Sequence, residues 1–324
     1  MEFKLIEAIR ERTARRRDDV VLGIGDDAAL LDMPPDRQLV ACTDTLVAGV
    51  HFLVDTAAED IGWKSLAVNL SDLAAMGAEP AWALLALTLP EADAHFVEKF
   101  ADGFAELAGV HGVALVGGDT TQGPLSVTVT VLGTTPRGEA LTRRGAGAGD
   151  AVFVTGTLGD AAGALRLLRE PRSGAVDPEQ RQMAALLARM HRPVPRIAAG
   201  LALRGVAGSC IDVSDGLLAD LGHVCAASGV GAEIDIEALP MSPALGVGFD
   251  RAACQELALT GGDDYELCFS VPENRAAEIG WRFADAGCRT TRIGRITEGL
   301  GVRVKDAQGN FIETPHAGWE HFSR

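Results

Sequence analysis

The sequence predicts a two-domain protein of the α/β class (α+β in the wider sense), and three observations support this. Its 324 residues suffice for about two domains. Apolar runs of strand length alternate with amphipathic helical segments in both halves of the chain. A stretch rich in glycine and charge, residues 136–150, separates the two halves. We therefore expect an N-terminal domain over residues 1–137 and a C-terminal domain over residues 138–324.

The first half begins with an expected short helix at residues 3–10 and a charged connector, mobile or solvated, from Glu11 to Asp19. The strongest helical pattern covers residues 60–77, where apolar side chains recur every three or four positions. Asn69 and Asp72 are three positions apart and share one face of that helix. Asp72 therefore either has a functional partner, or it makes only a local hydrogen bond or belongs to a solvated stripe. Residues 20–22 lead into the first Gly-Asp turn. Strands are expected at residues 39–43, 81–89, 113–116 and 126–132, and a further helix contains Phe96, Phe100, Phe104 and Leu107.

The second half again alternates strands and helices. Strands are expected at residues 151–155, 209–213, 267–271, 290–297 and 301–305, and helices after Asp160, from Asp215 to about Ala227 and over residues 273–286. Residues 170–180 are interpreted as a surface excursion, and Asp306–Asn310 as a turn. Ser214 or Asp215 could be a simple helix N-cap, which is the structural alternative to a role in binding.

Charge and composition restrict the function. The formal net charge is −16, from 29 basic and 45 acidic residues, which argues against nucleic acid or an anionic membrane as the main partner. No cysteine pair has the C-x-x-C spacing of a zinc or redox motif. The N-terminus lacks the apolar region of a signal peptide and no apolar run reaches membrane-spanning length, so a cytoplasmic location is expected.

Aspartates beside runs of small residues are the most informative local feature. They occur in Gly25-Asp26-Asp27, Thr43-Asp44, Ser71-Asp72, Gly118-Asp119, Asp212-Val213-Ser214-Asp215 and Gly262-Asp263-Asp264. Carboxylates brought close together repel one another and resist burial unless a cation is present. Hard oxygen ligands of this kind suit Mg²⁺, which proteins often share with nucleotide phosphates. A solvated acidic surface is the alternative interpretation.

Covalent catalysis is unsupported, because the chain has no G-x-S-x-G, Walker A, H-E-x-x-H or Cys–His signature. The inventory of carboxylates, hydroxyl groups and glycine-rich turns suits phosphoryl transfer. That chemistry depends mainly on positioning and charge neutralisation.

Seven stretches, in order along nearly the whole chain, resemble the thiamine-monophosphate kinases. That family belongs to the ATP-binding superfamily that also includes aminoimidazole ribonucleotide synthetase and selenophosphate synthetase. The stretches are GIGDDAALL at 23–31, TDTLVAGVHF at 43–52, WKSLAVNLSDLAAMGAEPAW at 63–82, VGGDTTQGPLSVTVTVLG at 116–133, ALTRRGA at 140–146, IDVSDGLLADLGH at 211–223 and LTGGDDYELCF at 259–269.

The resemblance implies a two-domain fold whose N-terminal sheets pair across a homodimer, with a C-terminal α/β domain completing the active site. It also implies Mg²⁺-dependent transfer of the ATP γ-phosphoryl group to thiamine monophosphate, giving thiamine diphosphate and ADP. Several Mg²⁺ ions would bridge aspartates and the nucleotide. The resemblance implies no nucleic acid partner and no membrane partner.

Carried over by motif, the resemblance implies roles for named residues. The metal ligands would be Asp27, Cys42, Thr43, Asp44, Asp72, Asp119, Asp212 and Asp215. The ATP contacts would be Gly118, Asp119, Arg143 and Ser214, and the substrate contacts His51, Asp263 and Trp319. Catalysis would depend on Asp44, Asp72, Asp119 and Arg143. Cys42 stands where relatives often have Ser and could bind a metal only through its carbonyl group; Asp263 stands where they often have Glu. Asp26 and Asp27 could exchange roles.

Two rival functions remain open. One is another ATP-dependent synthetase of the same superfamily. The selenophosphate member would need a reactive Cys near the N-terminus, and the first 41 residues contain none. The other rival is a non-catalytic nucleotide- or metal-binding relative, which would bind ATP without turnover.

Overall fold

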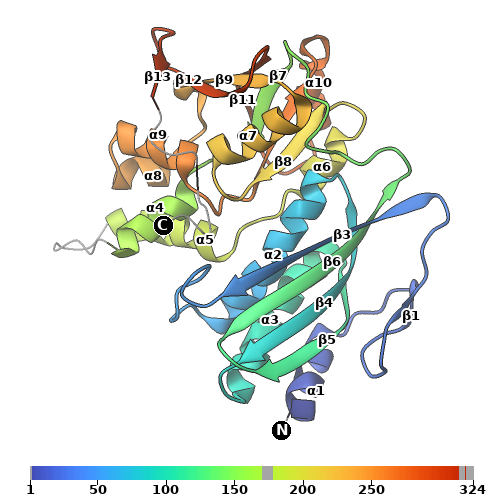
Figure 1. Ribbon diagram of the computed structural model, residues 1–324. Helices are drawn as coiled ribbons and strands as arrows, with labels where there is room; N and C mark the ends of the chain where they lie inside the picture. Colours follow the sequence, from blue (N-terminus) through green and yellow to red (C-terminus); the bar gives the residue numbers. More distant parts are fainter. Residues whose placement is uncertain (1, 170–177, 314–317, 319–324) are drawn as a thin grey trace. The chain divides into compact units, whose positions relative to one another are not determined.

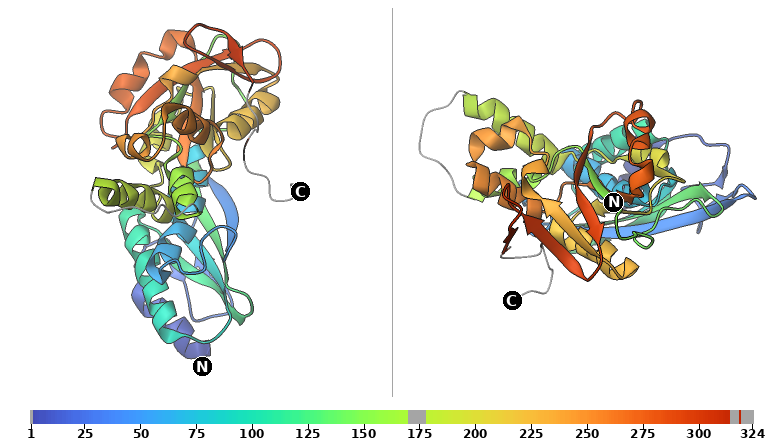
Figure 2. Two further views of the ribbon diagram at one scale, coloured as in Figure 1. Left: turned by 90° about the vertical axis from the view of Figure 1, so that its left-hand side faces the viewer. Right: turned by 90° about the horizontal axis from the view of Figure 1, so that it is seen from above.

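The computed structural model describes residues 2–169, 178–313 and 318. They divide into two compact units (Figures 1 and 2). The first comprises Met1–Leu73 and Ala78–Gly138, and the second comprises Ala74–Gly77 and Glu139–Arg324. No helix in the described part of the chain is both long enough and apolar enough to cross a membrane.

The first unit is built on a four-stranded sheet with the strand order β3-β6-β4-β5. Its strands are β3 (Arg37–Val47), β4 (Glu79–Leu89), β5 (Ala114–Gln122) and β6 (Ser126–Pro136). Helices α2 (Ala58–Ala75) and α3 (Ala94–His111) lie behind the sheet in Figure 1 and cover one of its faces. The short strands β1 (Val20–Leu22) and β2 (Leu30–Leu31) form an antiparallel pair beside it.

Two glycines explain how closely α2 and α3 pack. A Cβ atom added at Gly62 would lie 2.0 Å from the carbonyl oxygen of Phe100, and one at Gly103 would lie 1.9 Å from that of Glu59. Only glycine permits this backbone approach. The Asp93 side chain caps the start of α3 by accepting the N–H of Phe96, and Gly112 ends the helix in a left-handed conformation.

The N-terminal segment differs from the expected short helix and solvated connector. Helix α1 spans Glu2–Thr13. Arg12 forms ion pairs with Glu98 and Asp102 of α3, and Arg17 pairs with Asp19. Asp19 also accepts the indole N–H of Trp82 at 3.2 Å. The contacts of Arg12 with α3 and of Asp19 with Trp82 join residues far apart in sequence, so local charge alone did not indicate them, although residues 14–16 and 18 are exposed.

Two expected turns are strands in the structure. Asp44 was expected just after a short strand, but β3 runs for eleven residues and contains it. Asp119 was expected in a glycine turn, but β5 continues through it. In both cases hydrogen bonding to a neighbouring strand, in register with Val129 for Asp44 and with Ala86 for Asp119, extends the strand beyond its apolar run.

The second unit is built on a seven-stranded mixed sheet with the order β13-β12-β9-β11-β7-β10-β8. Its strands are β7 (Ala151–Thr155), β8 (Ser209–Val213), β9 (Gly231–Asp235), β10 (Glu266–Val271), β11 (Thr290–Thr297), β12 (Gly301–Lys305) and β13 (Phe311–Ile312). Its helices are α4 (Asp160–Arg169), α5 (Pro178–His191), α6 (Ile197–Leu203), α7 (Leu217–Ser228), α8 (Pro243–Gly248), α9 (Arg251–Thr260) and α10 (Glu278–Arg282), with short 3₁₀ turns η1 (Ile236–Ala238) and η2 (Glu273–Arg275).

Both faces of this sheet are buried at β7, β8 and β10, whereas β12 is exposed at alternate residues. Val152, Val154 and Ile211 pack on the face that α7 covers, in one apolar cluster with Leu221. Phe153 alternates with them and therefore lies on the opposite face. There it stacks on Phe269, which stacks in turn on Phe283, with ring centroids 5.5 and 5.8 Å apart.

The expected strands of the second half are all present, and Asp306–Asn310 is a turn closed by backbone hydrogen bonds. The expected helix at 273–286 is wrong in length, because only η2 and the five-residue α10 are helical there. Strand β9 was not predicted. The surface excursion proposed at 170–180 falls mostly outside the described residues.

Candidate active site

In the first unit, β3 and α2 bring two of the expected acidic residues together. The buried Asn69 of α2 accepts the backbone N–H of Asp44 with its Oδ1 atom at 3.0 Å, and its own amide donates to the Ser65 carbonyl at 3.0 Å. Asp72 lies three residues after Asn69, on the same face of the helix. The carboxylates of Asp44 and Asp72 therefore belong to one neighbourhood between the sheet and α2.

Cys42 shares the α2-facing side of β3 with Asp44, because the two residues are two positions apart in a strand. Its thiol donates to the carbonyl oxygen of Asn69 at 3.4 Å. Mg²⁺ selects oxygen ligands, so the chemistry fits a contact from the Cys42 carbonyl group rather than from sulfur.

Thr43 lies on the opposite face of the sheet from Asp44. Its hydroxyl group donates to the carbonyl oxygen of Val129 at 3.1 Å and accepts from the hydroxyl group of Thr130 at 2.9 Å. Adjacent residues of a strand direct their side chains to opposite faces. The Thr43 hydroxyl therefore cannot join the Asp44 carboxylate at one ion, and a shared contact would have to use the Thr43 carbonyl group.

Gly118 and Asp119 lie on β5, the outer strand opposite β3. Three strand spacings separate β3 from β5, roughly 14 Å at about 4.8 Å each. The sheet of one chain therefore does not place Asp119 beside Asp44. Gly118 has a positive φ of 152°, and an added Cβ atom would lie 1.8 Å from the Leu85 carbonyl oxygen, so no other residue fits there.

His51 is held by the connection between β3 and α2. Its Nδ1 atom accepts the backbone N–H of Val47 at 2.9 Å, and its carbonyl oxygen accepts from the Lys64 ammonium group at 3.1 Å. Since Nδ1 is an acceptor, the proton of the neutral ring resides on Nε2. His51 thus presents an N–H donor from its Nε2 side.

Asp26 and Asp27 occupy an exposed turn. One carboxylate oxygen of Asp26 accepts the backbone N–H of Asp27 at 2.8 Å. This contact gives Asp26 a role in holding the turn, whereas it leaves the Asp27 side chain out of the turn's hydrogen bonding.

In the second unit, one end of the sheet collects several expected site residues. Strand β8 ends at Val213, antiparallel β10 begins beside it at Glu266, and the turns after and before these strands carry Ser214, Asp215 and Asp263. Asp263 donates its backbone N–H to the Ser214 carbonyl oxygen at 2.8 Å. Asp212 lies on β8 itself and is buried. Asp212, Ser214, Asp215 and Asp263 are therefore neighbours.

Asp220 holds the turn that carries Ser214 and Asp215, and sequence reasoning missed it. Its Oδ2 atom accepts the consecutive backbone N–H groups of residues 214, 215 and 216 at 3.0, 3.1 and 3.1 Å. Burial, together with repulsion from Asp212 and Asp215, raises the pKa of Asp220 to about 7. A cation bound by those two acids would lower it again. The sequence signal that could have identified Asp220 is its position as an acid in the first turn of a predicted helix.

This arrangement also decides what Ser214 offers to a ligand. Its N–H donates to Asp220 and its carbonyl oxygen accepts from Asp263, so the hydroxyl group is the part suited to a nucleotide contact. The N-cap of α7 is Gly216, without a side-chain cap. The structural alternative, in which Ser214 or Asp215 is a simple N-cap, is therefore wrong.

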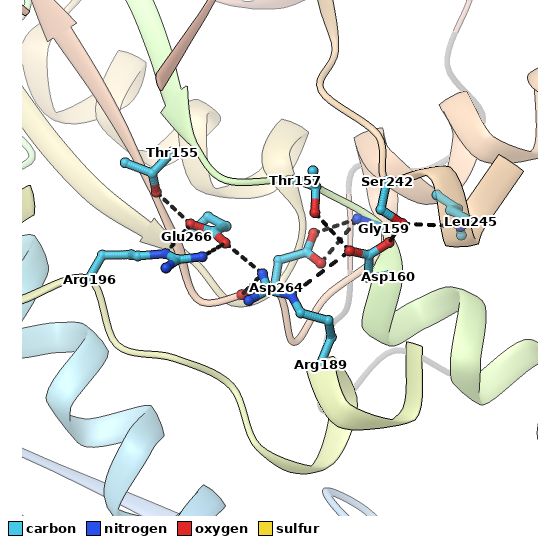
Figure 3. A network of polar contacts seen from close by, with 10 residues as sticks. All are labelled: Thr155, Thr157, Gly159, Asp160, Arg189, Arg196, Ser242, Leu245, Asp264 and Glu266. Atoms are coloured by element: carbon cyan, nitrogen blue, oxygen red, sulfur yellow. Dashed lines mark hydrogen bonds and ion pairs between the residues drawn. The ribbon is translucent and has the colours of Figure 1, made fainter. Parts of the chain in front are cut away.

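A second network lies beside this turn (Figure 3). The fully buried Glu266 accepts two hydrogen bonds from Arg196 at 2.6 and 2.5 Å, one from Arg189 at 2.5 Å and one from the Thr155 hydroxyl group at 2.7 Å. Its neighbour Asp264 accepts the Gly159 N–H with both carboxylate oxygens, and burial raises the pKa of Asp264 well above its usual range. The network fixes the start of β10 and hence the base of the Asp263 loop.

Of the two remaining expected residues, Arg143 is not brought into this group. The segment that carries Arg143 is held by its backbone beside Cys210, at the start of β8, because the Thr142 carbonyl accepts the Cys210 N–H. That point is about 13 Å along the strand from Ser214. Trp319 lies outside the described residues. Within the described ranges, no group of three or more His, Cys, Asp and Glu side chains is arranged to hold a metal ion by itself.

Family models match both units. Residues 25–135 match the AIR synthase related protein N-terminal domain, and residues 147–307 match the corresponding C-terminal domain. Thiamine-monophosphate kinase of Escherichia coli K12 is 46% identical over 99% of this chain and 98% of its own length. The enzyme of Haemophilus influenzae is 40% identical over the same shares.

Solved structures agree with this family. The crystal structure of thiamine-monophosphate kinase from Stenotrophomonas maltophilia superposes with a TM-score of 0.87 at 53% identity, covering 94% of this chain and 96% of that one. AaThiL complexed with AMPPCP and TMP gives 0.78 at 36% identity, covering 99% and 97%. Hydrogenase maturation protein HypE in complex with ATP, at 20% identity, shares the fold alone, with a TM-score of 0.77 over 97% and 95%. The two-domain, mixed α/β fold expected from the sequence is confirmed.

Proposed function

Because the chain belongs to the thiamine-monophosphate kinase family, we propose that it transfers the γ-phosphoryl group of ATP directly to thiamine monophosphate, giving thiamine diphosphate and ADP. The observation that carries this proposal is similarity at 46% identity over 99% of the chain to a kinase of that specificity. The related AaThiL has been solved with AMPPCP and TMP together. The clustered acids of both units supply the residue types that such chemistry requires.

The reaction needs little covalent help from the protein. A terminal phosphate oxygen of thiamine monophosphate attacks the γ-phosphorus in line, a P–O bond forms, and the bond to the ADP oxygen breaks. A phosphate monoester has a second pKa of about 6, so the attacking oxygen is largely ionised near neutral pH and no general base is assigned. Positioning and charge neutralisation are then the main requirements.

Mg²⁺ fits the acidic residues of the first unit, where Asp44 and Asp72 offer hard carboxylate oxygens from two elements. When bound, the ion offsets the negative charge of the phosphates. Asp27, Asp119, Asp212 and Asp215 complete the acidic ligands, with carbonyl groups at Cys42 and Thr43. Mg²⁺ commonly binds one or two carboxylates together with nucleotide phosphates, so we propose that it enters with ATP.

The remaining residues have binding roles in this proposal. Gly118, Asp119 and the Ser214 hydroxyl contact ATP, and Arg143 offsets charge on the transferring group. His51, Asp263 and Trp319 contact thiamine monophosphate. Because these residues belong to both units, we propose that the N-terminal domain supplies most metal contacts and the C-terminal domain completes the site.

Product analysis with alternative acceptors tests this function. With ATP and Mg²⁺, thiamine monophosphate should yield thiamine diphosphate, whereas unphosphorylated thiamine should not be phosphorylated. Addition of excess EDTA should abolish the product. ATP binding without any thiamine diphosphate would favour the non-catalytic alternative, and a product from ATP and another acceptor would favour a synthetase.

Substitution of His51 tests the substrate contact. His51→Ala removes the Nε2–H donor, so the KM for thiamine monophosphate should rise by about tenfold, as expected for the loss of one hydrogen bond to a charged group. The KM for ATP should change less than twofold. Steady-state kinetics with each substrate varied in turn measure both values. An unchanged KM for thiamine monophosphate would remove His51 from the substrate site.

We also propose that two chains pair through the four-stranded sheets. The face of the sheet away from α2 carries threonines and apolar residues, among them Leu84 and Leu39, which are 37% and 51% exposed. Thr43 and Thr130 lie on the same face. An accessible sheet face of this character suits burial against a second copy.

An arginine on that face tests the pairing. Leu84→Arg should convert a dimer to a monomer, because it would bury an unpaired charge in the interface. Leu300→Arg is the matched control, since Leu300 is 80% exposed in the turn between β11 and β12. Light scattering coupled to size exclusion gives the mass of each variant. A dimeric Leu84→Arg protein would contradict pairing through this face.

A further inference from the structure

The loop between α9 and β10 stores backbone strain at two side-chain-bearing residues. Asp263 and Tyr265 have positive φ angles of 67° and 51°, and they are the only non-glycine residues of this kind in the described ranges. This left-handed conformation is unfavourable for residues with a Cβ atom and uncommon for a bulky aromatic residue. Glycine would adopt it without strain. Such strain persists where the side chains themselves are needed.

Contacts on both sides prevent the loop from relaxing. Asp263 and Tyr265 donate their backbone N–H groups to the carbonyl oxygens of Ser214 and Val213, each at 2.8 Å. Between them, Asp264 is held by the Gly159 N–H through both carboxylate oxygens, at 3.0 and 2.8 Å. The loop is therefore fixed at three successive residues.

Tyr265 is the single tyrosine of the chain, and its ring is buried. Its hydroxyl group donates to Oδ1 of Asp263 at 2.9 Å. A planar carboxylate with one oxygen held by a rigid aromatic donor has a restricted orientation. The two strained residues are thus joined through their side chains as well as through the loop.

We propose that Tyr265 is a positioning residue that orients the Asp263 carboxylate toward thiamine monophosphate. The inference deepens the proposed function and rests on the place of Asp263 in the substrate site. Thiamine monophosphate carries a positively charged thiazolium ring and an aminopyrimidine with N–H donors. A fixed carboxylate is complementary to both kinds of group, and a carboxylate held in one orientation loses less entropy when substrate binds. Tyr265 thereby contributes to substrate affinity without touching the substrate.

Tyr265→Phe tests this role, because it keeps the buried ring and removes the hydroxyl group. The KM for thiamine monophosphate should rise about fivefold to twentyfold, near the lower end of the effect of one hydrogen bond to a charged group, because Tyr265 acts only through Asp263. The KM for ATP should stay within about twofold, and the melting temperature within about 4 °C, since one such loss is small for a chain of this size. Thr260→Val, which removes a hydroxyl group bonded only within α9, is the matched control and should leave both KM values unchanged.

A double-mutant cycle with Asp263→Ala separates positioning from general damage. If Tyr265 acts through Asp263, the Tyr265→Phe change should have little further effect on the KM once Asp263 is alanine. Additive effects, an unchanged KM for thiamine monophosphate, or equal losses for both substrates would each overturn the role of Tyr265. A wild-type protein without turnover of thiamine monophosphate would instead contradict the proposed function itself.

Discussion

Asp44→Asn and Asp72→Asn should each lower the Mg²⁺-dependent turnover number by about 10²- to 10³-fold, the usual cost of removing one group that stabilises charge in a transition state. The two residues lie on β3 and α2, and Asn69, which shares a helix face with Asp72, accepts the backbone N–H of Asp44. Asparagine keeps the shape of the side chain but removes the negative charge that attracts the ion. The Mg²⁺ concentration for half-maximal rate should rise in parallel.

The fold should survive both changes. Removal of one of two like charges in the same neighbourhood relieves repulsion in the protein without ligand, so the melting temperature should be unchanged or higher. Glu91→Gln is the matched control, because Glu91 is an exposed acid just after β4 and has no proposed metal role. Kinetics over a range of Mg²⁺ concentrations measure the effect. Near-normal rates in both aspartate variants would refute the metal site between β3 and α2.

Glu266→Ala should lower the free energy of unfolding by about 3–5 kcal/mol, as expected when one partner of a buried ion pair is removed. Glu266 is fully buried and is the shared partner of Arg189 and Arg196, whose side chains are only 22% and 14% exposed. Without it, two guanidinium groups remain poorly solvated inside the second unit. Thr155 also loses the acceptor of its hydroxyl group.

Urea unfolding at neutral pH measures this loss. Glu278→Gln is the control, because Glu278 also joins two arginines but lies nearer the surface, where ion pairs contribute little. The loss for Glu278→Gln should therefore be much smaller. Equal stabilities for the two variants would show that the network in Figure 3 does not hold the second unit together.

Local pattern was sufficient to predict most elements, because apolar periodicity reports which face of a segment is buried. The helix expected at 60–77 is α2, with Leu66, Leu70 and Leu73 fully buried. Periodicity does not report hydrogen bonds to neighbouring strands. For that reason Asp44 and Asp119 were expected beyond the ends of short strands, although both lie inside strands.

The site was predictable as a set of acidic motifs, but not in its supporting contacts. Glu266 and Arg189 are 77 positions apart in sequence, and no local pattern connects them. Asp220 is visible in the sequence as an acid in the first turn of a helix, but that position does not indicate that it accepts three backbone N–H groups. The LTGGDDYELCF stretch was sufficient to predict a role for Asp263. The role inferred for Tyr265 depends on backbone angles that only the structure provides.

The most direct test of direct phosphoryl transfer is the stoichiometry of the complete reaction. With ATP, Mg²⁺ and thiamine monophosphate, ³¹P NMR should show one thiamine diphosphate formed for each ADP, with no inorganic phosphate beyond the background without acceptor. Inorganic phosphate released in place of thiamine diphosphate, or ATP that remains intact while bound, would contradict the assignment of this chain as a thiamine-monophosphate kinase.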